Sequence, residues 1–486
     1  MSPLPIAIGL IIYTLLILGV GFAAVRLNRT LDDYLLADRK LGPWVAAFSE
    51  RASGESAWLL IGLPGLAFLT GMSAIWVGVG CVSGIAFSWF MIARRLREET
   101  GRYNALTLAD YFEARHGDSS HVLRVTATVI ILFFFTFYVA AQFLAAGKVL
   151  NVYVKIPEVW GMIIGAILIL FYTAAGGLFA VAWTDLIQGI IMLLTLSMLP
   201  LATLIEVGGI GGLQERLAAA GPSFVSWGTQ GKSWLAEAGV FGSLAIGLGY
   251  MGQPHLVLRF MAITSAQEVR KGRIIAITWA LIAFLGAVMI GVTGLAYYGL
   301  DALGEGGQFT DKEHLMPQMA RDFMPEWLAV IMICGAIAAM MSTADSQLLS
   351  SASAVSEDIY RRLLKPDATQ RQLLAVSRWA TLAVGVVAFV LAWQMDVFVY
   401  TLVLYAWAGL GSAFGPPLLL SLWWRGTSRD GVLAGFITGT VVVISWYNIS
   451  DLTVHVYEMI PGFFVSLAAT LLVSKLRPSR RTGNFE

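Results

Sequence analysis

Residues 49–56 of this chain read SERASGES and residues 247–255 read GLGYMGQPH, and each stretch interrupts an otherwise apolar run. Runs of about 20 apolar residues are long enough to cross a membrane as a helix. A helix can be broken in hydrocarbon only where protein or a water-filled cavity satisfies the freed backbone groups. Matched breaks in two halves of a helical bundle are typical of transporters that bind their cargo near the midplane. These two stretches therefore predict both the fold class and the place where the chain binds something.

Around these stretches the composition is that of a membrane protein. The 486 residues are 57% hydrophobic and only 13% charged, whereas an average soluble domain carries about 25% charged residues. We expect one integral membrane domain over residues 1–486, with no soluble domain appended. Thirteen apolar segments are predicted to span the membrane, near residues 4–26, 42–69, 73–96, 120–149, 157–176, 182–206, 235–262, 272–299, 325–356, 374–394, 397–423, 430–448 and 453–475.

The basic residues are distributed unevenly between the two sides. With the N-terminus outside, 25 of the 32 Lys and Arg residues fall in cytoplasmic segments or at the cytoplasmic ends of spans, and six fall outside. Cytoplasmic loops are enriched in Lys and Arg, so the sequence predicts an outside N-terminus and a cytoplasmic C-terminus. The first span lacks the basic start and cleavage site of a signal peptide, and we expect it to be retained.

The positions of the breaks suggest an inverted repeat. If span 4–26 is set aside as an extra helix, five spans over about 42–206 and five over about 235–423 have opposite topology, and each set begins with a broken helix. Spans 430–448 and 453–475 follow. The predicted fold class is an all-α polytopic membrane protein with thirteen helices.

Four short strings carry a family resemblance. They are ALTLADYF (105–112), GGLFAVAWTD (176–185), GYMGQPH (249–255) and MSTADSQ (341–347). In order and spacing they resemble the solute:sodium symporter family, and within it most closely the bacterial sodium/proline symporters, from about residue 5 to about 475. The resemblance implies a LeuT-type five-plus-five fold, no enzymatic activity and sodium-coupled symport of a small amino acid, with proline first. It also implies a bacterial plasma membrane, Na⁺ as the coupling ion and no organic cofactor.

A pair of hydroxyls on the ninth predicted span is the candidate ion site. Sodium needs about five or six hard oxygen ligands, several of them carbonyls freed where a helix unwinds. A Ser-Thr pair in a membrane helix more often packs or bonds to its own backbone. The resemblance implies that this pair belongs to a sodium site, whose ligands would be Ala52, Glu55, Ala339, Ser342 and Thr343.

Three further polar residues suggest a second ion or a coupling role. Asp185 follows Trp183-Thr184 at the head of the sixth predicted span, where an exposed interfacial carboxylate is the simpler interpretation because acids favour helix starts. The resemblance implies an effect on sodium dependence at this position. Asp345 and Ser346 lie one turn beyond the hydroxyl pair and could face the same second ion.

The family's substrate site lies between the two broken helices and the fourth span. Backbone groups freed at a half-helix would attract the carboxylate of a small zwitterion, and aromatic walls would cover its apolar part. For any single aromatic residue, ordinary packing is the commoner role. The implied substrate residues are Ser56, Ala57, Trp58, Tyr138, Gln142, Ile246, Tyr250 and Pro254.

The chain departs from the sodium/proline pattern at two places. Those symporters usually read Ala-Ser-Asp-x-Ser-Gly-Trp in the first break, whereas this chain reads ASGESAW at 52–58, which moves the acid to Glu55 and places Ala57 at a glycine position. A buried carboxylate often marks an ion or proton route, so proton coupling through Glu55 is an alternative, as is pairing with Arg51. Ile246 replaces a tryptophan, and another small amino acid or a monocarboxylate is therefore an alternative substrate.

Other function classes are weakly supported by the sequence. The five histidines are scattered, so no cluster suits an intramembrane enzyme, and the short segment after residue 475 does not suit a sensor with a signalling domain. No GxxxxGK[ST] phosphate loop is present. The expected partners are a small-molecule substrate and the lipid bilayer, with no nucleic acid and no obligatory protein partner. The small-residue stretches 62–65 and 411–417 are either gates or simple kinks.

Overall fold

A computed structural model describes residues 3–25, 31–228, 234–395, 397–449, 452 and 455–478, and this part of the chain is built from helices. The first half consists of α1 (Pro3–Val25), α2 (Leu31–Leu36), η1 (Ala37–Arg39), α3 (Pro43–Gly54), η2 (Trp58–Gly62), α4 (Leu63–Thr70), η3 (Gly71–Ala74), α5 (Ile75–Met91), α6 (Ala93–Arg102), α7 (Leu108–His116), α8 (Val122–Val154), α9 (Glu158–Glu206), α10 (Gly209–Ala220) and α11 (Pro222–Val225). The second half consists of α12 (Trp234–Ala245), η4 (Ile246–Met251), α13 (Pro254–Ala262), α14 (Val269–Tyr298), η5 (Leu300–Ala302), η6 (Lys312–His314), α15 (Leu315–Phe323), α16 (Glu326–Ser353), η7 (Ala354–Leu364), α17 (Gln370–Gln394), α18 (Val399–Trp423), α19 (Arg429–Tyr447) and α21 (Met459–Leu476).

The helices follow the apolar segments of the sequence closely. Within the described residues, nine helices are long and apolar enough to cross a membrane, and three further apolar helices are shorter. The two spans expected over 157–206 form one element, α9, in which Gly177 leaves helical geometry at φ 62° and ψ −179°. Few residues other than glycine adopt a positive φ readily, so Gly177 marks the boundary between the two expected spans. Residues 453–454, the expected start of the last span, lie outside the described residues, and α21 begins at Met459.

The first predicted interruption is shorter in the structure than in the sequence. Helix α3 continues to Gly54, so the polar residues from 49 onward are still helical, and only Glu55 (φ −103°, ψ 7°) lies outside regular geometry. The chain then enters the π-helical turn η2 before α4. Short π-helical segments occur often at functional sites. The break is therefore a narrow one at residue 55, followed by a widened turn.

The second interruption agrees with the sequence prediction. Helix α12 leads into the 3₁₀ turn η4, and Gln253 is extended at φ −79° and ψ 110° immediately before Pro254 begins α13. A residue that precedes proline is disfavoured in the helical region, and proline itself suits the first turn of a helix. The sequence thus forces one helix to end and another to start here.

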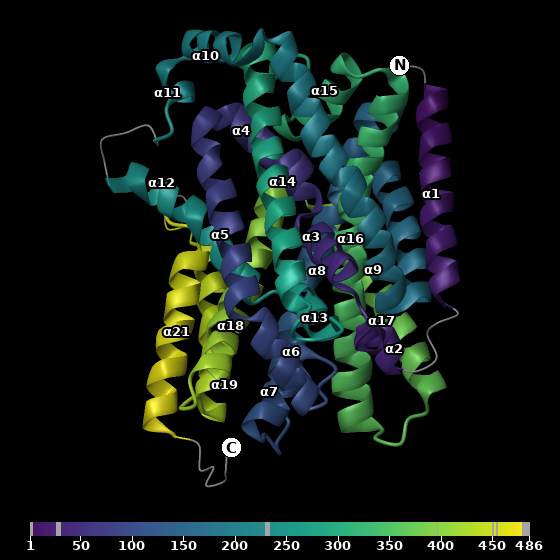
Figure 1. Cartoon of the computed structure of the whole chain (residues 1–486), viewed down its shortest axis with the longest axis vertical. Helices are drawn as coiled ribbons and strands as arrows, with labels where there is room; N and C mark the ends of the chain where they lie inside the picture. Colours follow the sequence, from purple (N-terminus) through teal and green to yellow (C-terminus); the bar gives the residue numbers. More distant parts are fainter. Residues whose placement is uncertain are drawn as a thin grey trace.

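The two interrupted segments meet in the middle of the bundle. Helix α3 packs against α9, α13, α14 and α16, and η4 packs against α5 and α18. Figure 1 shows α3, α8 and α16 near the centre, α1 along one edge, and α19 with α21 along the opposite edge. Helix α1 begins at the top of this view, whereas α21 ends at the bottom.

Glycines allow η4 to lie directly on its neighbours. A Cβ atom added at Gly84 of α5 would come within 2.0 Å of the carbonyl oxygen of Gly247, and one at Gly249 would come within 1.9 Å of Nε1 of Trp407. Small residues let backbones approach closely in membrane bundles. The glycine-rich string at 247–252 is therefore a packing requirement as well as a cause of the break.

Candidate functional site

Oxygen atoms from the first break and from α16 meet in one buried cluster. Oγ of Ser342 donates to the carbonyl oxygens of Ala52 at 3.0 Å and Ala339 at 3.2 Å, and Oγ1 of Thr343 donates to the carbonyl oxygen of Ser53 at 2.9 Å. All of these residues are fully buried. The cluster offers three carbonyls and two hydroxyls, which is a neutral set of hard oxygens suited to a small alkali cation.

The structure brings four of the five residues expected as ion ligands together and places Ser53 beside them. Ala52, Ala339, Ser342 and Thr343 come together as expected, and the carbonyl that Thr343 contacts is that of Ser53. Ser53 was not in the expected set. Ser53 follows Ala52 directly near the end of α3, and the carbonyls of both residues contact α16.

The side chain of Glu55 points to a different group of residues. Its Oε1 accepts from Nη1 of Arg51 at 2.6 Å, and both of its oxygens lie 3.0 Å from the hydroxyl of Tyr250. Arg51 also pairs with Glu50, and Nε1 of Trp89 donates to Glu50 at 3.0 Å. Every member of this group is buried. A carboxylate that only accepts hydrogen bonds is well satisfied as an anion, so the geometry favours the ion-pair interpretation of Glu55 over the proton-carrier alternative.

Asp185 is buried and surrounded by donors, so it is not an exposed interfacial carboxylate. Its Oδ2 accepts from Oγ of Ser49 at 2.5 Å and Oγ of Ser53 at 3.1 Å, and it pairs with Nη2 of Arg259 at 3.2 Å. The same guanidinium donates to Oγ of Ser346 at 2.5 Å and to Oγ of Ser53 at 3.0 Å. The residues expected for a second ion therefore surround a positive charge that belongs to the protein.

Arg259 is one of the 25 basic residues that the charge pattern assigned to cytoplasmic segments or span ends. Its side chain is fully buried against α3, α9 and α16. Asp345, the other expected carboxylate, accepts from Ser346 at 3.2 Å. Among the described residues, Oδ1 of Asp185 and Oδ2 of Asp345 have no hydrogen-bond partner.

The expected substrate residues gather on the other side of the first break. The backbone N–H of Ala57 donates to Oε1 of Gln142 at 3.3 Å, and Nε2 of Gln142 donates to the carbonyl of Tyr138 at 3.3 Å. The backbone N–H of Trp58 lies 3.4 Å from Oγ of Ser56. The buried hydroxyl of Tyr138 has no hydrogen-bond partner among the described residues. This group combines a freed N–H, an amide and an unused phenol, all of which can recognise a small polar molecule.

Trp407 of α18 also belongs to this group of residues. It was not predicted from the sequence. Its ring lies 4.6 Å from that of Tyr250 and 6.5 Å from that of Tyr138, measured between centroids. Its Nε1 donates to the carbonyl oxygen of Ile246 at 2.9 Å. The sodium/proline pattern has a tryptophan at position 246, where this chain has isoleucine. The indole of Trp407 nevertheless lies beside this position. The only local signal was an aromatic residue set among small ones, in the run AWAGLG at 406–411.

Of the remaining expected substrate residues, Ile246 contacts this group through its carbonyl, and Pro254 lies elsewhere. Ile246 is buried and presents its carbonyl to Trp407, so it does not face lipid. Pro254 begins α13 and lines a small hollow together with Leu258, Ser350 and Asp358. That hollow adjoins the ion pairs at one end of the bundle rather than the ring of Tyr138.

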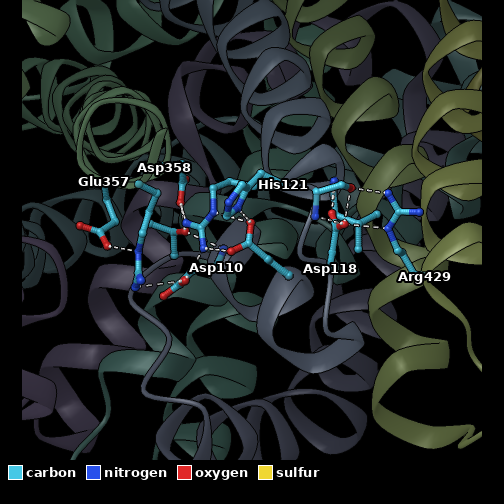
Figure 2. Close-up of polar contacts among 12 residues, drawn as sticks. Asp110, Asp118, His121, Glu357, Asp358 and Arg429 are labelled. Carbon is cyan, nitrogen blue, oxygen red and sulfur yellow. Dashed lines mark hydrogen bonds and ion pairs between the residues drawn. The ribbon is translucent and has the colours of Figure 1, made fainter. Parts of the chain in front are cut away.

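Ion pairs and hydrogen bonds cluster there, as Figure 2 shows for the row of labelled residues from Glu357 to Arg429. Arg124 of α8 pairs with Asp110 at 2.6 Å, Glu113 at 2.7 Å and Asp358 at 2.7 Å. Arg124 is also one of the 25 basic residues assigned to the cytoplasmic side, and its side chain is almost fully buried. The network joins α7, α8 and η7. Burial alone would raise the pKa of Glu113, but hydrogen bonds from Arg124 and His121 (also labelled) outweigh this effect and lower it.

A second buried ion pair lies on the opposite side of the site. Nζ of Lys148 in α8 lies 2.5 Å from Glu313 and 2.7 Å from Asp311, in the segment that contains η6. Glu313 also accepts from the backbone N–H groups of Val399 and Tyr400 at the start of α18. The site therefore lies between two sets of charged contacts, one toward each end of the bundle.

The chain is similar to known proteins both in sequence and in fold. The model of the sodium:solute symporter family matches residues 34–439. A high-affinity proline transporter of Bacillus subtilis is 39% identical over 458 residues, which are 94% of this chain and 95% of the relative. A sodium/proline symporter of Escherichia coli is 37% identical over 97% of this chain and 93% of the relative.

Two solved structures resemble the fold. A Na⁺-coupled sialic acid symporter in a substrate-bound, outward-open state superposes with a TM-score of 0.81 at 20% identity, covering 98% of this chain and 99% of that one. MhsT in complex with L-phenylalanine gives a TM-score of 0.55 at 14% identity, covering 89% and 97%. The all-helical, LeuT-like character of the fold is confirmed by these likenesses.

Proposed function

The chain belongs to the sodium:solute symporter family, and from this premise we propose that it is a secondary active transporter that carries proline together with sodium. The relatives described above are a proline transporter and a sodium/proline symporter, at 39% and 37% identity. Transport would proceed by alternating access, with the two interrupted segments forming the site. The alternatives are another small amino acid or a monocarboxylate as substrate, and a proton as coupling ion.

The proposed sodium ligands are the carbonyls of Ala52, Ser53 and Ala339 and the hydroxyls of Ser342 and Thr343. The present hydrogen bonds among these oxygens span 2.9–3.2 Å. Each hydroxyl keeps its lone pairs free while it donates, so a cation in their midst would replace three neutral hydrogen bonds with ion–dipole contacts. The ion would then hold α3 against α16.

Coupling follows from the position of Glu55 between the two binding groups. Residues 52–53 face the ion cluster, whereas residue 57 donates to Gln142 in the substrate group. Only the break at Glu55 separates them. When sodium fixes the end of α3, it also fixes the direction of the N–H groups that follow, so the substrate site is completed only when the ion is bound.

A proline zwitterion fits the chemistry of the second group. Its carboxylate would take the N–H groups of residues 57 and 58 and the hydroxyl of Tyr138, which is buried and without a partner among the described residues. Its pyrrolidine ring would pack on Trp407 and Tyr250, whose rings meet edge to face at an interplanar angle of 76°. The substrate carboxylate would give the Tyr138 hydroxyl the partner that it lacks among the described residues.

Alternating access needs a closure on each side of the site. We assign the outer closure to Lys148 with Glu313, and the inner closure to Arg124 with its three carboxylates. In each closure the charged partners come from different segments of the chain, so a closure opens only when the segments that carry its members move apart and both partners reach water. Opening of one at a time would expose the site to one side of the membrane.

The sodium gradient is sufficient as an energy source. One positive charge moving through about 100 mV gains about 2.3 kcal/mol. A tenfold sodium gradient adds about 1.4 kcal/mol. Together these terms would support accumulation of roughly several hundred-fold for each coupled sodium.

The topology we propose has thirteen spans in the inner membrane of a bacterium, with two inverted repeats over about 42–206 and 235–423. The opposite positions of the start of α1 and the end of α21 in Figure 1 support an odd number of crossings. The concentration of basic residues at the α21 end supports a cytoplasmic C-terminus. Two of the basic residues counted in that argument, Arg124 and Arg259, are buried, and the remaining excess is still large.

We propose a stoichiometry of one sodium per substrate, because Arg259 already supplies a cation to Asp185, Ser53 and Ser346. A second sodium at this place would have to displace a fully buried guanidinium. Parallel measurements of ²²Na⁺ and proline uptake into proteoliposomes should give a ratio of one. A ratio of two would contradict this assignment.

The observation that carries the proposal is the contact of Ser342 and Thr343 with the end of α3. The direct test is uptake of radiolabelled proline, small amino acids and short monocarboxylates into proteoliposomes. Each solute is measured with an inward sodium gradient, with an inward proton gradient in choline medium, and with no gradient. We expect proline uptake with sodium alone. Uptake driven equally by protons would establish the alternative coupling, and preference for another solute would establish the alternative substrate.

A further inference from the structure

A separate pocket lies at the end of the bundle that carries most of the basic residues, away from the transport site. It has a volume of about 510 Å³ and is formed by α6, the end of α7, the end of α18 and the loop that follows it. Four arginines line it: Arg95, Arg102, Arg115 and Arg425. Nothing in the proposed transport cycle uses this pocket.

The charge of the pocket is strongly positive. Glu99 is the one carboxylate in its lining, and it is already engaged by Arg115 at 3.2 Å and by the hydroxyl of Tyr111 at 2.6 Å. With histidine neutral, four guanidinium groups and one carboxylate leave a net charge of +3. Arg102 and Arg425 are exposed, and no ion pair joins either of them to a carboxylate within the described part of the chain. Two of the four charges are thus available to an external anion.

The pocket is built rather than being a chance cluster of flexible side chains. The guanidinium of Arg95 stacks on Trp423, with its carbon 3.4 Å from the ring centroid, and it donates to the carbonyl of Leu422 at 2.9 Å. The indole is fixed in turn, because Nε1 of Trp423 donates to the carbonyl of Met91 at 2.8 Å. One wall of the pocket is therefore held by three successive contacts between α5, α6 and α18.

Its position is that of a membrane interface. Trp423 ends the spanning helix α18 and is followed by Trp424 and Arg425. Tryptophans gather at the level of lipid headgroups, and basic pockets between helices on the cytoplasmic side bind anionic headgroups. A pocket bordered by the end of a spanning helix and by tryptophan would open near the level of the lipid phosphates.

We infer that this pocket binds a phosphate-bearing anion, of which the headgroup of an anionic phospholipid is the nearest source. Arg102 and Arg425 would pair with phosphate oxygens, a contact for which the guanidinium fork is well shaped. The stacked Arg95 and the indole of Trp423 would support the glycerol end of the headgroup. The bound lipid would join α6 and α7 to the end of α18.

The test is lipid retention by the purified full chain in detergent. Dioleoyl phosphatidylglycerol or dioleoyl phosphatidylcholine is titrated in, and bound lipid is measured by native mass spectrometry. The variant is Arg102→Gln with Arg425→Gln. The matched control is Arg94→Gln with Arg270→Gln, which removes two exposed charges from the same end of the molecule but outside the pocket. All four side chains are exposed, so folding is expected to be unaffected.

A basic residue near an anionic surface strengthens binding by roughly fivefold, so the double variant should retain phosphatidylglycerol about 25-fold more weakly than wild type and control. A second arm replaces lipid with millimolar inorganic phosphate and follows thermal stability. Stabilisation by phosphate that only the pocket variant loses, without preference for phosphatidylglycerol, would confirm the anion site and identify a soluble source. Equal behaviour of all three proteins toward both probes would overturn the inference.

Discussion

Replacement of Thr343 by valine is the sharpest test of the ion site. Oγ1 of Thr343 lies 2.9 Å from the carbonyl of Ser53 in a fully buried cluster of five oxygens. Valine keeps the shape and removes only the hydroxyl. Contacts between a polar group and a charge contribute about 1.5–3 kcal/mol, which corresponds to a factor of about 10 to about 150 in affinity. We expect the half-saturating sodium concentration for proline uptake to rise by that factor, with the maximal rate at saturating sodium changed much less.

The assay is sodium-dependent uptake of radiolabelled proline into proteoliposomes at a fixed membrane potential. Thr343→Ser retains the hydroxyl and should stay close to wild type. Thr195→Val is the matched control, because Thr195 is a buried threonine whose hydroxyl bonds to the carbonyl of Ile191 within its own helix. Its sodium dependence should be unchanged.

Two results would exclude the Thr343 hydroxyl as an ion ligand. If Thr343→Val has the half-saturating sodium concentration of wild type, the hydroxyl does not bind the ion. If Thr343→Ser is as impaired as Thr343→Val, the effect comes from packing of the methyl group and not from the oxygen.

Three further predictions follow from the other contacts. Trp407→Phe keeps an aromatic ring but loses the hydrogen bond to the carbonyl of Ile246 at 2.9 Å. The half-saturating proline concentration should rise by about three- to tenfold, as for one hydrogen bond of about 1 kcal/mol. A wild-type value would remove Trp407 from the site. Glu55→Gln leaves Arg51 with one carboxylate fewer. It should lower the melting temperature, while proline uptake stays sodium-dependent. If uptake instead becomes independent of the coupling ion, Glu55 is a proton carrier. The folded-state pKa of Glu113 is lowered. The stability that its carboxylate contributes should therefore be constant from pH 8 to about 5 and be lost as the pH falls below the ordinary glutamate pKa of about 4.5. If the stability deficit of Glu113→Gln in thermal unfolding already disappears near neutral pH, this expectation is contradicted.

The helices were predictable because hydropathy and helix breakers act locally. The apolar runs give the spans, and Gln253-Pro254 ends one helix and starts the next wherever the segment lies in the bundle. The extent of the first break was overestimated for the opposite reason. Ser49 and Glu50 look unsuited to a membrane helix, but side chains from elsewhere in the fold satisfy them, so α3 continues to Gly54.

What escaped prediction is the pairing of residues distant in sequence. Arg259 and Arg124 were counted by charge alone, and only the fold reveals that Asp185 and Asp358 lie 3.2 Å and 2.7 Å from them. Trp407 lies 161 residues from Ile246, and its role depends on a hydrogen bond to a backbone carbonyl, for which any residue type would serve. Such contacts leave no periodic or compositional trace in a single sequence.

In the proposed mechanism, ion and substrate share one broken helix and therefore bind cooperatively. The most direct measurement is equilibrium binding of proline to the purified chain across a range of sodium concentrations, with choline as the replacement cation, and of sodium with and without proline. We expect sodium to strengthen proline binding at least about tenfold and proline to strengthen sodium binding by the same factor, since coupling free energy is reciprocal. Proline affinity that is equal in sodium and in choline would contradict it.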